Sequence, residues 1–181
     1  MADTFERVDK GDYGYKAEQV EEFLERAKQA YGGDDSLGID ETSVRNIAFD
    51  WVRGGYDPKL VDAALDRLES AFVQQRRARV VDEEGEAAWL DRTYELAQSL
   101  YPRLMRPNGE KFADATGQGY AKKDVDALMA RLADYFSGTQ SLSSADLRLA
   151  SFPTARGSQA YSEAVVDVFI DRAVSVLLAV E

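Results

Sequence analysis

Carboxylates, hydroxyls, lysines and arginines are the only side chains with polar chemistry of catalytic use in this sequence, which contains no cysteine and no histidine. Thiol nucleophiles, disulfides, zinc sites of thiolate or imidazole, and the usual acid–base group at neutral pH are therefore excluded. The adjacent acids Glu83 and Glu84 are typical of a charged surface rather than of a shielded acid–base pair. The run Asp34, Asp35 and Asp40 lacks the alternating ligands and closing glutamate of a calcium loop. We predict no catalytic residue, no cofactor and no metal, and hence no enzyme.

The charge balance limits the partners. The chain of 181 residues has 33 acidic and 22 basic side chains and a net charge of −11, so nucleic acid or an anionic membrane would repel it as a whole. The cluster 76–79 holds three arginines, but acids follow it at once, which favours local charge pairing. We predict no binding to nucleic acid, and at most a weak and local membrane contact. The segment Met1–Glu6 has no features of a leader, and no apolar run reaches membrane length, so we expect a cytoplasmic protein.

One motif occurs four times. A tyrosine is followed after five residues by a valine, the next residue is acidic, an arginine lies five residues beyond the acid, and a large apolar residue lies five beyond the arginine. A glycine precedes the tyrosine in three copies, and Ala160 replaces it in the fourth. The tyrosine–valine pairs are Tyr15 and Val20, Tyr56 and Val61, Tyr120 and Val125, and Tyr161 and Val166. The acids are Glu21, Asp62, Asp126 and Asp167, the arginines Arg26, Arg67, Arg131 and Arg172, and the last anchors Tyr31, Phe72, Phe136 and Leu177.

The second copy explains this spacing physically. Asp57 is a good N-cap and Pro58 suits the first helical position, which places Tyr56 just before the cap and Val61 in the first turn. Tyrosine and valine then form a hydrophobic staple, and Ser162 is expected to cap the fourth copy similarly. The alternative, a ligand site in each copy, is less favoured than a core role for tyrosine and valine and a surface salt bridge for arginine.

The repeat predicts an all-α fold. Apolar residues recur at three, four, seven and eleven positions after each valine, which is one stripe of a short helix that must pack on another helix. We predict a module of short helix, loop and stapled helix, with short helices at 43–48 and 144–151. The modules would pack as a bundle or as short coiled-coil pairs. Parallel and antiparallel packing are both sterically open.

The intervals between the tyrosines divide the chain into two related pairs of copies. They are 41, 64 and 41 residues, so the middle interval holds an insertion. We predict a first pair at 1–72, with copies at about 5–31 and 43–72, and a second pair at 107–181, with copies at about 110–136 and 144–178. The intervening 73–106 should form helix, weak point and helix, with Trp89 and Tyr94 packed between the halves.

The second copy, Ser43–Phe49 through Arg53-Gly54-Gly55-Tyr56-Asp57-Pro58 to Leu65, resembles the N-terminal domain of the DivIVA family, and the fourfold form is similar to the DivIVA-repeat proteins of actinobacteria. The resemblance implies a cytoplasmic, non-catalytic scaffold of cell division or polar growth. It also implies an N-terminal domain that pairs as a short parallel coiled coil and touches the membrane through its loop. Members usually continue into a long coiled coil, whereas this sequence ends shortly after its fourth helix.

The family's loop presents an apolar or aromatic residue and a basic residue before Gly-Tyr. Only Trp51-Val52-Arg53 offers that combination here. We interpret Trp51 as packed under its own loop, because stable membrane attachment generally needs more than one signal. The leading hypothesis is a scaffold or adaptor that binds division or cell-envelope growth proteins and can self-associate. The alternative is a peripheral membrane module that uses the loop Trp51–Arg53 at the inner face of the cell membrane.

Overall fold

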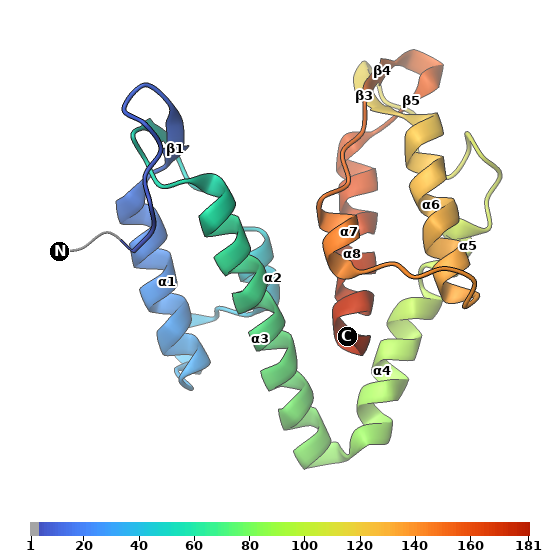
Figure 1. The fold of residues 1–181 in the computed structure, drawn as a ribbon. Helices are drawn as coiled ribbons and strands as arrows, with labels where there is room; N and C mark the ends of the chain where they lie inside the picture. Colours follow the sequence, from blue (N-terminus) through green and yellow to red (C-terminus); the bar gives the residue numbers. More distant parts are fainter. Residues whose placement is uncertain (1–3) are drawn as a thin grey trace. The chain divides into compact units, whose positions relative to one another are not determined.

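The computed structural model describes residues 4–181, so the start of the segment Met1–Glu6 lies outside it. The chain forms two compact units, one up to Arg79 and one from Val80, and each is described by itself. Both are mostly helical, as expected (Figure 1). The purely all-α prediction needs one correction, since five short β-strands also form.

The first unit is built on two long helices, each preceded in the chain by one strand of a two-stranded sheet. In chain order its elements are β1 (Tyr13–Tyr15), α1 (Ala17–Tyr31), a 3-10 turn (Asp35–Leu37), α2 (Glu41–Arg45), β2 (Trp51–Arg53) and α3 (Pro58–Glu84), whose last residues belong to the second unit. β1 and β2 are antiparallel. The core contains Val20, Phe23, Val44, Phe49 and Val61, from both long helices and the segment between them.

The second unit contains the same kind of sheet and helix pair, with two further helices. Its elements are α4 (Glu86–Gln98), α5 (Tyr101–Leu104), β3 (Gln118–Ala121), α6 (Lys122–Phe136), α7 (Ser144–Arg148), β4 (Thr154–Arg156), a 3-10 turn (Gly157–Gln159), β5 (Ala160–Tyr161) and α8 (Glu163–Val180). β3 is the central strand, antiparallel to both β4 and β5.

The long helices of each unit are parallel, which settles the orientation left open by the sequence. In the first unit Tyr15 and Tyr56 exchange backbone hydrogen bonds of 2.9 and 2.8 Å just before α1 and α3 begin. The far ends of these helices also meet, because the rings of Tyr31 and Phe72 lie 5.5 Å apart. In the second unit α6 and α8 both start from the β3–β5 pair and run away from it in the same direction (Figure 1).

The segment 73–106 is divided between the units. α3 continues without a break past residue 72 and ends at Glu84, and the next residue, Gly85, has a φ of 90° and forms the expected weak point. Beyond it, Trp89 on α4 is 2% exposed and its Nε1 donates to the carbonyl of Ala179 on α8. The expectation that Trp89 and Tyr94 pack between the halves is wrong, since Trp89 packs inside the second unit and Tyr94 is 65% exposed.

Candidate functional site

The repeated tyrosines and acids form reciprocal pairs between the two copies of each unit. In the first unit Tyr56 Oη donates to the Glu21 carboxylate, and Tyr15 bonds to Asp62. Each tyrosine therefore bonds to the acid on the helix of the other copy. The second unit repeats this exchange: Tyr161 Oη donates to Asp126 Oδ1 at 3.0 Å, and Tyr120 bonds to Asp167.

The valines and tyrosines expected to form the staples lie in or beside the two cores. Val20, Val61, Val125 and Val166 are all fully buried, at 0% exposure. The tyrosines differ within each pair, because the second one, Tyr56 or Tyr161, is fully buried, whereas Tyr15 and Tyr120 are partly exposed. Ser162 stands at the start of α8 but its side chain makes no capping bond, which corrects the capping expected there.

The glycines before the tyrosines allow the two backbones to approach closely. A Cβ on Gly55 would lie 2.5 Å from the carbonyl oxygen of Tyr15, and one on Gly14 or Gly119 would overlap the carbonyl oxygen of Tyr56 or Tyr161. None of these three has the positive φ that favours glycine. Close approach, and not a left-handed turn, is therefore the reason for glycine at these positions.

The repeated arginines do not form the surface salt bridges that were expected. Arg26, Arg67, Arg131 and Arg172 are all exposed, and none of them makes an ion pair with a carboxylate of residues 4–181. The ion pairs of the helices use other residues. In the first unit Arg45 of α2 pairs with Glu69 of α3, which is 2% exposed, and Arg76 pairs with Glu41 at 2.8 Å.

The four tyrosines of these pairs have pKa values raised above the ordinary value of 10.0. Burial, together with the bond to Asp126, raises the pKa of Tyr161 to about 12. Burial also raises the pKa values of Tyr15, Tyr56 and Tyr120. A hydroxyl with a raised pKa remains a donor at neutral pH and does not serve as a base there. The pairs therefore act as fixed hydrogen bonds between copies.

The segment Trp51–Arg53, expected to be a loop, forms the strand β2, and its tryptophan is exposed. Trp51 is 58% exposed, so the interpretation of a side chain packed under its own loop is wrong. One side of its ring contacts Tyr15, with centroids 4.9 Å apart. Tyr13 on β1 is 55% exposed and lies opposite Arg53, whose guanidinium is 5.5 Å from the Tyr13 ring centroid. We call Tyr13, Trp51, Val52 and Arg53 the aromatic tip.

Acidic residues considered for chemistry have local structural roles. Asp34 and Asp40 accept backbone hydrogen bonds at helix starts, from Ser36 and Ser43. Glu83 and Glu84 are exposed, and Glu84 pairs with Arg92 at 2.7 Å. Residues 4–181 contain no group of three or more acids suited to hold a metal ion. In the same range, every helix is too short or too polar to cross a bilayer.

The sequence predicted which residues repeat but not that they cross between copies. The sequence did contain a sign of this crossing. An acid follows the valine in all four copies, although a hydrophobic staple needs no acid. Comparison with protein-family models, curated proteins and solved structures finds no match to this chain.

Proposed function

We propose that this protein is a non-catalytic scaffold or adaptor of the DivIVA type, in which four copies of one module form two pairs within a single chain. The observation that carries the proposal is the reciprocal tyrosine–acid exchange. In each unit the tyrosine of either copy contacts the acid of the other, and contacts exchanged in both directions are what a symmetric pair of identical helices makes. Tandem copies supply both partners from one chain.

The repeat supports a structural role because its buried members are all used in packing. The valines are in the core, the tyrosines and acids bind each other, and the glycines lie where two backbones meet. Four kinds of residue lie exposed: the repeated arginines, the acids Glu21, Asp62 and Asp167, the anchor Tyr31 and, on one sheet, the aromatic tip outside the repeat. Side chains committed to packing are poor candidates for catalysis, and exposed ones are available to partners.

Proximity labelling in the native cell tests the scaffold function. We expect proteins of cell division or envelope growth to be labelled by the wild-type chain. Trp51→Ser is expected to lower this labelling, and Leu149→Ser, which changes an 83% exposed residue away from the tip, serves as the matched control. A diffuse protein that labels no such partner and whose deletion leaves division unchanged contradicts the proposal.

The solution mass tests the internal pairing. If the copies satisfy one another within the chain, the purified protein sediments with the mass of one chain, 20.1 kDa. A dimer that dissociates when Tyr56→Phe and Tyr161→Phe are combined would instead place the tyrosine–acid exchange between chains.

A second candidate function, peripheral membrane binding, is favoured by the exposure of Trp51 and Tyr13 beside Arg53. Aromatic rings with a neighbouring cation suit the interface between headgroups and acyl chains. Sedimentation with vesicles of phosphatidylglycerol and phosphatidylcholine tests it. Wild type should sediment with the vesicles and Trp51→Ala should not, while equal recovery of both in the supernatant rejects membrane binding by the tip.

A further inference from the structure

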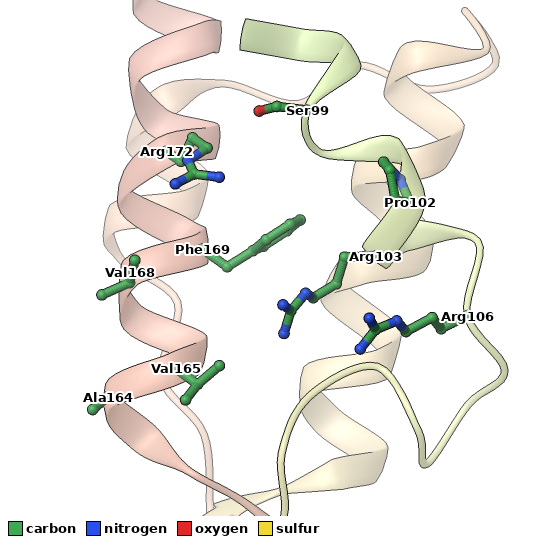
Figure 2. A pocket seen from close by; sticks show the side chains of 9 residues that line it. All are labelled: Ser99, Pro102, Arg103, Arg106, Ala164, Val165, Val168, Phe169 and Arg172. Atoms are coloured by element: carbon green, nitrogen blue, oxygen red, sulfur yellow. The ribbon is translucent and has the colours of Figure 1, made fainter.

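Three arginines gather around one pocket of the second unit. A cavity of about 380 Å³ lies between α5 and α8, and Arg103 and Arg106 extend into it from the α5 side while Arg172 reaches it from α8 (Figure 2). Its apolar wall includes Phe169 and Val165 of α8. The volume lies within the range of small-molecule sites, roughly 300–1,000 Å³.

No carboxylate neutralises these cations. No acidic residue lines the pocket, and within residues 4–181 none of the three arginines forms an ion pair. The pKa of Arg103 is lowered by burial and by the neighbouring charges of Arg106 and Arg172. Three guanidinium groups without a counterion are unusual in a chain whose net charge is −11. Their mutual repulsion is relieved when an anion lies between them.

A buried lysine holds the two arginines of the α5 side in place. Lys111 is 5% exposed, and its Nζ donates to the carbonyl oxygens of Leu104 and Arg106 at 2.7 Å each, which fixes the chain at the end of α5. The carbonyl of Lys111 in turn accepts from Nη1 of both Arg103 and Arg106 at 3.4 Å. Two guanidinium groups therefore converge on one backbone oxygen. They are positioned before any ligand arrives, which lowers the entropic cost of binding.

The pocket is polar on one side and apolar on the other. Phe169 points into the space between α8 and α5, with Val165 below it and the two guanidinium groups opposite (Figure 2). Its ring packs on Phe112, with centroids 5.3 Å apart, and is 7% exposed, so only its edge lines the pocket beside the partly exposed Val165. Arginine's planar fork matches the oxygens of carboxylate and phosphate, and the apolar side chains opposite it can contact an apolar substituent. A simple inorganic ion would leave the apolar wall in contact with water.

We propose that this pocket binds an amphiphilic anion: a phosphate or carboxylate attached to an aromatic or branched apolar group. The oxyanion lies between Arg103, Arg106 and Arg172, and the apolar group packs on Val165 and the edge of Phe169. The same chemistry is carried by a free small molecule and by a modified or acidic side chain of a protein. The binding itself is independent of the scaffold function proposed above.

Phenyl phosphate is the first probe, titrated into the whole chain while the arginine Nε–Hε signals are followed by NMR. We expect saturable shifts of Arg103, Arg106 and Arg172. Inorganic phosphate should bind roughly tenfold more weakly, because it leaves the apolar wall uncovered, and benzyl alcohol should not shift the arginines. Phenylacetate distinguishes a carboxylate from a phosphate ligand, and binding of either probe by this pattern supports the proposal.

Two variants and a matched control locate the binding. Arg103→Gln and Arg106→Gln are each expected to weaken phenyl phosphate binding by about tenfold, the loss of one charge-assisted interaction. Arg131→Gln is the control, since Arg131 holds the repeat position of Arg172 on α6 and lies outside the pocket. Unchanged binding in both pocket variants, equal loss in the control, or no saturable arginine shift with either probe would overturn the proposal. Such a result would leave the scaffold proposal intact, because that proposal is tested separately by proximity labelling of partners.

Discussion

The tips of the two sheets have the same backbone register but differ in their aromatic residues. β1 pairs with β2 so that Tyr13 faces Arg53 and Tyr15 faces Trp51. In the second unit β3 pairs with β4 in the corresponding register, where Gln118 faces Arg156, Tyr120 faces Thr154 and Gly119 faces Ala155. The first tip therefore presents two exposed aromatic rings and the second presents glutamine and threonine. Of the residues paired in these registers, the two tips share the glycine, the tyrosine that follows it and an arginine, and the other positions differ.

The two units also differ in what supports the helix pair. In the first, the core lies between α1, α3 and the segment that joins them. In the second, α4 packs on α8 through Trp89 and α5 lies next to the arginine pocket. One unit thus carries the aromatic surface and the other the cationic pocket. The two units therefore share an architecture and expose different chemistry.

The largest expected effect is on the free energy of unfolding, and it differs between the two tryptophans, one in each unit. Trp89→Ala should destabilise the second unit by about 3–5 kcal/mol, because it removes a large ring that is 2% exposed. Trp51→Ala, at 58% exposure, should change stability by less than about 0.5 kcal/mol. Urea unfolding followed by circular dichroism measures both. Acrylamide should quench the fluorescence of Trp51 in Trp89→Phe far more than that of Trp89 in Trp51→Phe.

The next effect concerns the glycines where the backbones approach. Gly119→Ala should cost about 1–3 kcal/mol, since its Cβ would overlap the Tyr161 carbonyl and lie 2.8 Å from the Ala115 side chain. Gly117→Ala, two residues earlier, has nothing within 4 Å of its Cβ and serves as the control. Thermal unfolding compares them. Equal melting temperatures for the two variants would show that the close approach is not required.

Loss of a single hydroxyl should distinguish the buried tyrosine of a pair from its partly exposed partner. Tyr161→Phe removes the donor to Asp126, which is 5% exposed, and the acceptor of the Lys111 backbone N–H. We expect a loss of about 1–3 kcal/mol, because both buried groups lose a partner. Tyr120→Phe should cost less, since water reaches that site. Equal free energies of unfolding for the two variants would contradict this ranking.

The smallest effect is on carboxyl titration. Burial raises the pKa values of Asp62 and Asp167 above 3.8, whereas bonds from Ser143 lower that of the exposed Asp146 below it. Because folded Asp62 binds its proton more readily than the unfolded chain does, its contribution to stability increases as the pH falls through its folded pKa. The contribution of Asp146 has the opposite sign and is lost as the pH falls through its folded pKa.

Carbon-13 NMR of the side-chain carboxyls measures these midpoints. Tyr15→Phe provides the internal check, because the hydroxyl bond of Tyr15 lowers the pKa of Asp62 and its removal should raise the midpoint further. Tyr120→Phe should do the same to Asp167 in the second unit and leave Asp62 unchanged. A midpoint of Asp62 that falls in Tyr15→Phe would exclude the reciprocal bond.

The sequence by itself determined the local features of the fold. The apolar period and the Asp57-Pro58 start predicted the stapled helices, and the structure begins α3 at Pro58 with the Asp57 carboxylate accepting from the Lys59 N–H. These features are predictable because residues three or four apart on a helix share one face. The short helices at 43–48 and 144–151 were predicted in the right regions, and their observed bounds, Glu41–Arg45 and Ser144–Arg148, are shorter.

Only the tertiary structure decided which distant groups meet. Tyr56 bonds to Glu21, and Arg103 and Arg172 line one pocket, although the residues of each pair are far apart in the chain. The exposure of Trp51 likewise depends on which distant residues cover it. Helical periodicity says which face is apolar but not which helix covers it, so both parallel and antiparallel pairings satisfied the sequence. The strands were missed for the same reason, since segments of two to four residues become strands only where a second backbone supplies their hydrogen bonds.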